Sequence, residues 1–480
     1  MRSLLESLGD AEETVYRPYI NTGTPMDMAN GKFIPSRYGG WGLSGGLGLS
    51  TAFIAEANRF KSTSLNSMLI NGLARFPDSV AMLGDTENSS RTKGELADMS
   101  NLHLDDPIAR EQHIDDLKSR IRVFDQTTST FESLDAYFDH FKKIRDDKVA
   151  HHKDYTVETE LVNVDTGKPD RILIPTFASI DSWTEAKVRQ VNVKNEEHTA
   201  DTEMSAQRTI NMEEGWQKAR LMRQMAGICA KGSIVLGITG HLGKKISMDG
   251  KPTKKDMAFM GQDQSAKSMG NKFYFSMHSM FGINNSAPLV NKVDRKLPEY
   301  PLGDTVSNNE LMELDQVLIR SKNSPSGASF KVVSSQGHGV ESSMSHYHFL
   351  RTNKYFGLGS PTKTRSPFFP DLDIGRTKIM AIAHGYKLSR ALELTYQLFV
   401  IQSSWSMHNQ AVDFSIPIEK LVEELAKTSY ATDDILNSRG WWTYMGADGK
   451  PKSDRPFLTL PDIICMINGT YKPKFFAVKS

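Results

Sequence analysis

The stretch from 47 to 73 constrains the fold more than any other part of the chain. An apolar run, Leu47 to Ile54, leads into a short polar loop that ends in Lys61-Ser62. Beyond the loop, apolar residues recur at three- and four-residue spacing, which predicts a helix with one buried face: Leu65, Met68, Leu69 and Leu73. A strand, a loop and a helix in this order direct backbone N–H groups, a helix N-terminus and an ammonium group toward one anion.

This loop is a candidate phosphate-binding loop. Lys61 would contact nucleotide phosphates, and the Ser62 hydroxyl would face a Mg²⁺ ion. The usual pattern is G-x-x-x-x-G-K-[ST], whereas Ala55 and Phe60 replace both glycines here, so the letters alone also fit an ordinary strand–turn–helix. The candidate nucleotide-binding residues are Glu56, Ala57, Asn58, Arg59, Phe60, Lys61, Ser62 and Thr63.

Length and composition narrow the class of protein. A chain of 480 residues has room for two or three domains, and its formal net charge of +1 means that any basic surface must be local. Two cysteines provide no disulfide framework, which fits a reducing compartment. The acidic start of the chain differs from a secretion signal, and no apolar run approaches the ~18 residues of a membrane span. These features predict a soluble intracellular protein with no membrane partner.

Two carboxylates follow predicted strands. The run Val80 to Leu83 ends in Asp85-Thr86-Glu87, and Glu87 is the candidate that orients an attacking water. Residues 156–164 and 171–180 are predicted to form a hairpin, whose second strand ends at Asp181. Asp181 would hold the water shell of Mg²⁺, although an aspartate at this position could also be a helix N-cap.

The next segments combine a histidine with two long loops. After a polar loop over 191–210 and a helix over 213–230, the strand Ser233 to Ile238 ends near His241, a candidate γ-phosphate sensor or simply a loop residue. The loop that follows is rich in lysine, which favours either contact with a nucleic-acid backbone or a solvated loop. Its lysines are Lys244, Lys245, Lys251, Lys254, Lys255, Lys267 and Lys272.

Further along, the strand-like run Glu313 to Ile319 leads into Arg320-Ser321-Lys322, and a returning strand is predicted over 328–335. Two cations one residue apart project to the same side and suit an anion presented from outside, although solvated edge charges have the same pattern. Beyond a Pro- and Ser-rich linker over 361–370, the chain is predicted to be mainly helical, with an aromatic cluster at 441–444 that fits core packing or base stacking.

The order of these features resembles the RecA-type ATPase core over roughly residues 20 to 350, and is most similar to bacteriophage UvsX-like recombinases. The segment 56–62 resembles their nucleotide loop, which also has Phe before Lys-Ser, and 76–87 is similar to the strand with the catalytic glutamate. The segment Leu318 to Asn323 resembles the one whose two basic residues, here Arg320 and Lys322, reach the nucleotide of the neighbouring subunit.

The resemblance implies an α/β fold with a RecA-like P-loop core and a central, mostly parallel sheet. It divides the chain into an N-terminal arm for subunit contact (1–36), the ATPase core (37–360) and a smaller, mainly helical C-terminal domain (361–480). DNA-binding loops are expected at about 184–211 and 241–272. The implied protein binds ATP, Mg²⁺ and single-stranded DNA, forms a head-to-tail helical filament and pairs homologous duplex DNA in the cytoplasm of an infected bacterium. A RecA-like replicative helicase, or a DNA-binding filament protein that has lost ATP hydrolysis, remains the alternative.

Overall fold

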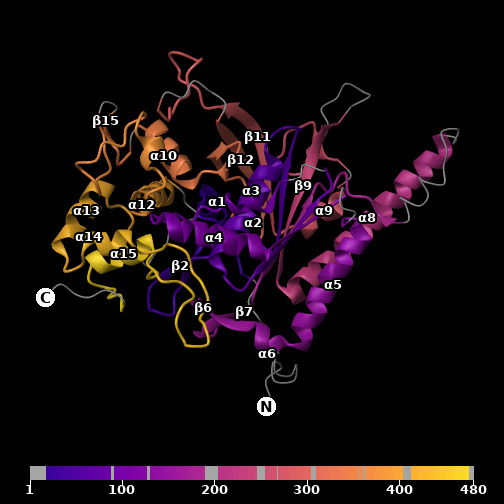
Figure 1. The fold of residues 1–480 in the computed structure, drawn as a ribbon, viewed down its shortest axis with the longest axis horizontal. Helices are drawn as coiled ribbons and strands as arrows, with labels where there is room; N and C mark the ends of the chain where they lie inside the picture. Colours follow the sequence, from indigo (N-terminus) through magenta and orange to yellow (C-terminus); the bar gives the residue numbers. More distant parts are fainter. Residues whose placement is uncertain are drawn as a thin grey trace.

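The structure is a computed structural model. It describes residues 18–87, 91–126, 130–189, 204–245, 254–267, 269–303, 310–354, 356–360, 363–403 and 412–474. Within them, ten strands form one mixed sheet that runs through the middle of the molecule (Figure 1). Residues 1–17 of the expected N-terminal arm lie outside the described residues.

Six strands of this sheet are parallel and lie side by side. Their order is β11 (Ser279–Pro288), β3 (Ser50–Ala55), β9 (Ile234–Lys244), β8 (Thr176–Asp181), β4 (Val80–Asp85) and β5 (Ile121–Asp125). Four of the six strands were predicted from apolar runs close to these bounds. The sheet therefore confirms the expected α/β class with a mostly parallel centre.

Antiparallel strands continue the sheet beyond β11 and also pair with the end of β9. β12 (Leu311–Ser321), β13 (Ser329–Ser335) and β14 (Gly339–Val340) follow β11, and β10 (Gln264–Ala266) pairs with the end of β9. The strands predicted over 313–319 and 328–335 are confirmed by β12 and β13.

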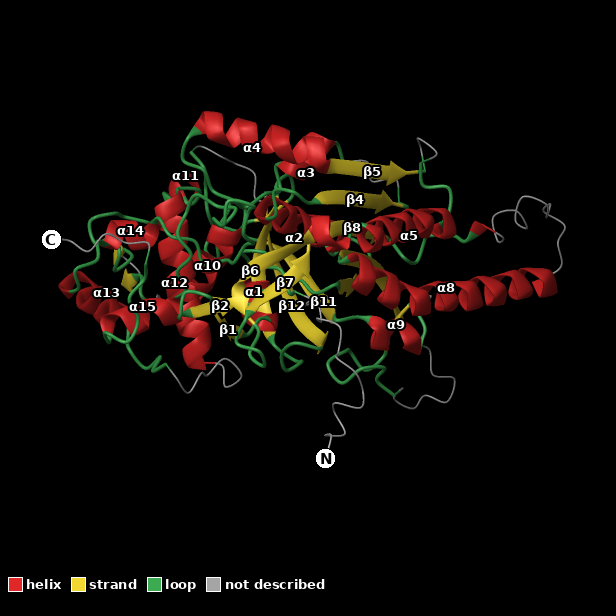
Figure 2. Cartoon of the chain, turned by 90° about the horizontal axis from the view of Figure 1, so that it is seen from below, coloured by secondary structure: helices red, strands yellow, loops and turns green. Residues whose placement is uncertain are grey.

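Each face of the sheet is covered by helices, because its central strands are apolar on both sides. In β3, Phe53 and Ala55 belong to the core under α2 (Lys61–Arg75), while Ala52 and Ile54 belong to the core under α5 (Leu134–Ala150) and α8 (Met204–Gly232). α3 (Lys93–Ala97) and α4 (Pro107–Arg120) lie on the α2 side, and α9 (Asn271–Ser276) packs on α8 (Figure 2). The sheet is thus the middle layer of three.

Three predicted elements differ from the structure. The predicted hairpin is β6 (Thr156–Val162) with β7 (Pro169–Leu173), and the chain then breaks at Pro175 before β8, so 171–180 is two strands in two sheets. α8 begins at Met204, within the predicted loop over 191–210, and β9 continues to Lys244, beyond His241. β5 was missed because its charged residues Arg122 and Asp125 interrupt the apolar pattern of this edge strand.

The remaining elements surround the ends of the sheet. They are α1 (Pro25–Asn30), the pair β1 (Phe33–Pro35) and β2 (Trp41–Leu43), α6 (His152–Tyr155), α10 (Ser342–Thr352), the pair β15 (Gly359–Ser360) and β16 (Lys363–Thr364), α11 (Ile379–Ile382), α12 (Tyr386–Ser403), α13 (Ile418–Lys427), α14 (Thr432–Leu436) and α15 (Leu460–Ile467). In the described residues after 361, the helices α11 to α15 form most of the regular secondary structure, joined by long irregular segments.

The C-terminal region packs against the hydrophobic core around α2 and the central sheet. Trp442 and Tyr444 are buried, and their rings contact Phe76 at centroid distances of 5.3 and 5.8 Å. Nearby, Arg439 forms a fully buried ion pair with Glu160 at 2.7 Å. The aromatic cluster at 441–444 is therefore core packing. The described part of the expected N-terminal arm also packs on its own chain, with Ile20 and Met26 fully buried.

Candidate functional site

The loop between β3 and α2 has the backbone of an anion cradle. Asn58 and Phe60 have positive φ angles of 58° and 57°, which turn the chain sharply before α2 begins at Lys61. Phe60 is the N-cap residue and has no polar side chain, so the first N–H groups of α2 receive no side-chain cap from it. Residues 56–58 are exposed, whereas the Arg59 guanidinium donates a hydrogen bond of 3.0 Å to the side-chain oxygen of Asn285 on β11. Helix donors at the start of α2 are thus available to an anion.

Lys61 is the buried cation of this loop. Its side-chain ammonium donates to the Glu56 carbonyl oxygen at 3.1 Å, and the residue is only 6% exposed. Burial lowers the pKa of Lys61, against the opposing effect of the Glu87 and Asp181 carboxylates. Among the described residues this ammonium has only a carbonyl as its hydrogen-bond acceptor, and a partly desolvated ammonium in that position gains strongly from a phosphate.

Asp181 lies at the end of β8, beside the start of α2. Its Oδ1 accepts a hydrogen bond of 2.5 Å from the Thr239 hydroxyl. Burial raises the pKa of Asp181 to about 6, although hydrogen bonds from Thr239 and Ser62 oppose that shift. Ser62 and Asp181 are therefore hydrogen-bonding neighbours beside the start of α2, and a Mg²⁺ ion between them stays a prediction.

Glu87 and His241 meet across the end of the sheet. The Nε2 atom of His241 lies 3.0 Å from the Glu87 Oε1 atom, and both side chains are partly exposed. Burial raises the pKa of Glu87, but hydrogen bonds with Ser182 and His241 and the charges of His241 and Lys61 outweigh it, so the pKa is lower than usual. Glu87 is thus an ionised carboxylate at neutral pH, oriented by a histidine and open to solvent.

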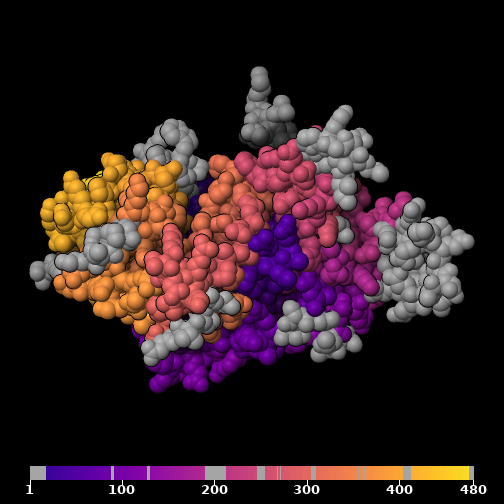
Figure 3. Space-filling view, turned by 90° about the horizontal axis from the view of Figure 1, so that it is seen from above, coloured from indigo at the N-terminus to yellow at the C-terminus, as the bar shows by residue number. Residues whose placement is uncertain are grey.

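Strand register explains why residues so distant in sequence converge. Ala55 is the register partner of His241, and Asp85 is the register partner of Asp181. The carboxyl ends of the four parallel strands β3, β9, β4 and β8 therefore lie together on one side of the sheet. The turn after β4 is held there because the Thr86 amide donates to the Asp181 carbonyl oxygen at 2.6 Å. The early part of the chain, which includes this loop, reaches the surface in the middle of the face seen in Figure 3.

Arg320 and Lys322 lie at the opposite edge. Arg320 is the register partner of Met280, and Met280 in turn pairs with Ala52, near the beginning of β3. The end of β12 is therefore separated from the phosphate loop by about four residues of strand, roughly 13 Å, and by two strand spacings of about 4.8 Å each. The structure does not bring these two cations to the loop of their own chain.

The lysine-rich segment is partly structured. Lys245 is paired with Asp256 at 2.5 Å, β10 lies within the segment predicted as a loop over 241–272, and α9 begins at its end. Lys244, Lys254, Lys255, Lys267 and Lys272 are exposed, and Lys251 lies outside the described residues. Of the other expected DNA loop, 184–211, residues 190–203 also lie outside them.

Sequence reasoning missed two polar residues of the site. Thr239 is the direct partner of Asp181, and Arg91 donates to the Thr63 hydroxyl at 3.3 Å, next to the start of α2. A polar residue at the carboxyl end of a parallel strand was the available signal for Thr239. No such signal exists for Arg91, because only the folded chain carries it to α2.

The described residues contain no cluster of three or more His, Cys, Asp or Glu side chains able to hold a metal by themselves. In that part of the chain, every helix is too short or too polar to cross a membrane. No protein-family model and no curated protein matches the sequence.

Proposed function

We propose that this chain is an ATP-dependent DNA recombinase of the RecA type, which binds single-stranded DNA as a head-to-tail filament and pairs it with homologous duplex. The observation that carries the proposal is the convergence of Lys61, Ser62, Asp181, Glu87 and His241 at one edge of a parallel sheet. Their roles match the parts that phosphoryl transfer requires: positioned cations, a metal site and a group that orients water.

Each residue has one task in the proposed reaction. Lys61 and the N–H groups at the start of α2 bind the phosphates of ATP, and Ser62 and Asp181 hold Mg²⁺. When bound, this metal would neutralise charge that develops on the phosphates. Two protein oxygens fit Mg²⁺, because in nucleotide sites it takes one or two carboxylates and completes its shell from phosphates and water. Glu87 orients the attacking water, and His241 positions Glu87.

The place of Arg320 and Lys322 supports a site shared between subunits. A charge-assisted hydrogen bond requires about 2.7–2.9 Å, and these cations lie far beyond that range of their own phosphate loop. On the sheet edge opposite the loop, they are placed to serve the nucleotide of the next copy in a head-to-tail stack. Exposed lysines of the segment 241–272 would contact the DNA backbone.

The proposal is tested by measuring ATP turnover with and without single-stranded DNA. We expect DNA-stimulated hydrolysis in the native protein and loss of ATP binding in Lys61→Ala. Lys420→Ala, which removes an exposed lysine on α13, is the matched control and should keep full activity. ATP binding that survives Lys61→Ala would overturn the nucleotide site. Binding without hydrolysis under any condition would favour the filament protein that has lost its ATPase.

A further inference from the structure

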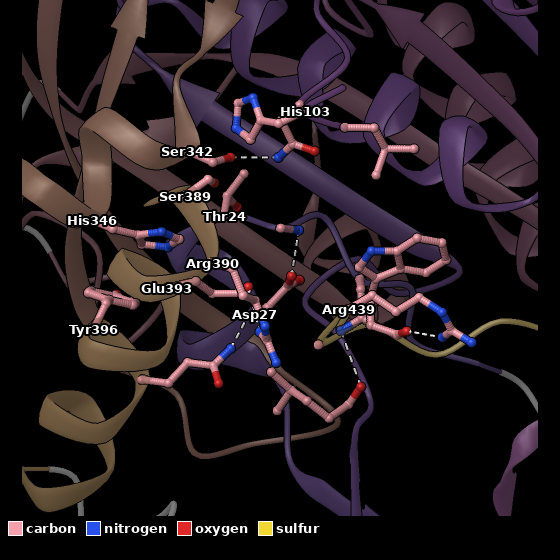
Figure 4. A pocket seen from close by; sticks show the side chains of 18 of the residues that line it. Thr24, Asp27, His103, Ser342, His346, Ser389, Arg390, Glu393, Tyr396 and Arg439 are labelled. Atoms are coloured by element: carbon pink, nitrogen blue, oxygen red, sulfur yellow. Dashed lines mark hydrogen bonds and ion pairs between the residues drawn. The ribbon is translucent and has the colours of Figure 1, made fainter. Parts of the chain in front are cut away.

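A polar cavity of about 60 Å³ lies at the other end of α2 from the phosphate loop (Figure 4). It is enclosed by α1, the end of α2, α10, α12 and the segment 439–441. At about 10–15 Å³ for each water-sized position, it holds roughly five non-hydrogen atoms. Arg75 ends α2 and Lys61 begins it, so at 1.5 Å per residue the two sites are about 21 Å apart.

Arg75 brings a positive charge into this cavity. Its residue is 3% exposed, and Nη1 donates to the Asn71 carbonyl oxygen at 2.7 Å and to the Asn101 side chain at 3.1 Å. Nε has no hydrogen-bond acceptor, and no carboxylate of the described chain forms a salt bridge with the guanidinium. Burial lowers the pKa of Arg75 to about 10, against the attraction of Asp27, so the side chain remains charged at neutral pH.

Asp27 does not complete the hydrogen bonding of this guanidinium. Its two carboxylate oxygens accept from the backbone N–H groups of Thr22, Gly23 and Gly46 at 2.7–2.9 Å, and from the Thr22 hydroxyl at 3.0 Å. The carboxylate is thus saturated by donors of its own loop. It stabilises Arg75 only at longer range.

Two more buried donors line the same cavity, as Figure 4 shows for His346 and Arg390. Arg390 is 2% exposed and gives its terminal nitrogens to Glu393 and to the Leu458 carbonyl oxygen, which leaves Nε without an acceptor. His346 is 3% exposed, and its Nδ1 atom has no partner among the described residues. Burial lowers the pKa of His346 to about 4, so its neutral ring can donate one hydrogen bond from Nδ1.

We propose that this cavity binds a small oxyanion of the phosphate type, held by Arg75, Arg390 and His346. The carboxylates of Asp27 and Glu393 also lie at this cavity and attract Arg75, but neither is within salt-bridge distance of its guanidinium. Water would satisfy the free donors without adding an anion in contact with Arg75, whereas ion pairs at contact distance offset the cost of burying a charge. An oxyanion of about five non-hydrogen atoms provides both charge and acceptors. Its binding joins the end of α2 to α10 and α12.

The test measures the binding of inorganic phosphate by calorimetry and by thermal unfolding, against potassium chloride of equal ionic strength. Phosphate could also bind the phosphate loop, so three proteins are compared: native, Lys61→Ala and Arg75→Met. We expect phosphate at ten times its Kd to raise Tm by about 1–3 °C in the native protein and in Lys61→Ala. Arg75→Met should weaken the affinity at least about tenfold.

Each other outcome overturns the proposal. A response abolished in Lys61→Ala but kept in Arg75→Met assigns all binding to the phosphate loop. No response in any protein means that the cavity holds only water. If Arg75→Met does not fold, His346→Phe replaces it, because it removes the ring nitrogens, keeps an aromatic ring against Tyr396 and should also weaken phosphate binding severalfold. Unchanged affinity in that variant would equally refute the site. None of these results depends on ATP hydrolysis.

Discussion

Complementation between two inactive variants tests whether each active site is built from two chains. Glu87→Gln removes the carboxylate that we propose orients water, and Arg320→Ala/Lys322→Ala removes the cations at the opposite end of the strands. Each protein alone should bind ATP but be nearly inactive, because every site lacks one component. Mixed in equal amounts, they should recover turnover.

The size of the recovery follows from the geometry. The cations lie roughly 13 Å along the strands from their own phosphate loop, so under the proposed arrangement a complete site would take Glu87 from one chain and the cations from the next. In a randomly mixed filament, half of the chains keep Glu87 and half of their neighbours keep the cations. About a quarter of the sites are then intact, so up to about a quarter of native activity should return.

The assay is steady-state ATP hydrolysis on single-stranded DNA, titrated over mixing ratios. A mixture of Glu87→Gln with Lys61→Ala is the matched control, because these two residues belong to the site of one chain. In that mixture the sites that keep Glu87 all lack Lys61, so no recovery is expected. No recovery in the first mixture, or equal recovery in both, would refute the shared site.

Three further predictions concern a buried ion pair, the pH dependence of stability and DNA binding. Glu160→Gln leaves Arg439 buried without its ion pair and should lower the free energy of unfolding in urea by about 3–5 kcal/mol. Glu158 lies on the same strand and forms an exposed pair with Arg37 at 3.5 Å, so the control Glu158→Gln should lower it by less than about 1 kcal/mol. Equal losses in the two variants would contradict this. Burial raises the pKa of Asp181 to about 6 from 3.8, so the folded protein holds this proton more tightly than the unfolded chain, and the resulting stability is full below pH 3.8 and is lost as pH rises through 6. Nucleotide-free Asp181→Asn should therefore be more stable than native protein at pH 8, by up to about 3 kcal/mol in thermal unfolding, and the difference should shrink toward pH 4. A difference that does not change with pH would show that the carboxylate is not desolvated. Lys244, Lys254 and Lys255 are exposed lysines of the segment 241–272. Replacing them by Ala should make the slope of log affinity for single-stranded DNA against log salt shallower, by about 0.7 for each DNA phosphate that is no longer neutralised. An unaltered slope would mean that these lysines are only solvated.

The central part of the fold followed from local patterns. Apolar runs ending in polar residues predicted β3, β4 and β8 with their site residues, because a parallel strand buried on both faces is a continuous apolar segment. The stripe that begins at Leu65 predicted α2 for the same kind of reason. Prediction was poorest at the sheet edge: β5 has charged residues and depends on its pairing with β4 rather than on its own apolar content.

The sequence by itself determined which residues carry the candidate chemistry: Lys61 and Ser62 before a helix, and Glu87 and Asp181 after buried strands. Only the tertiary structure decided which of them meet. Register brings His241 to Glu87 and Thr239 to Asp181, while the antiparallel direction of β12 carries Arg320 to the opposite edge. It also formed the Arg439–Glu160 pair and the cavity around Arg75. Contacts between residues hundreds of positions apart depend on strand order and direction, which no local pattern of side chains encodes.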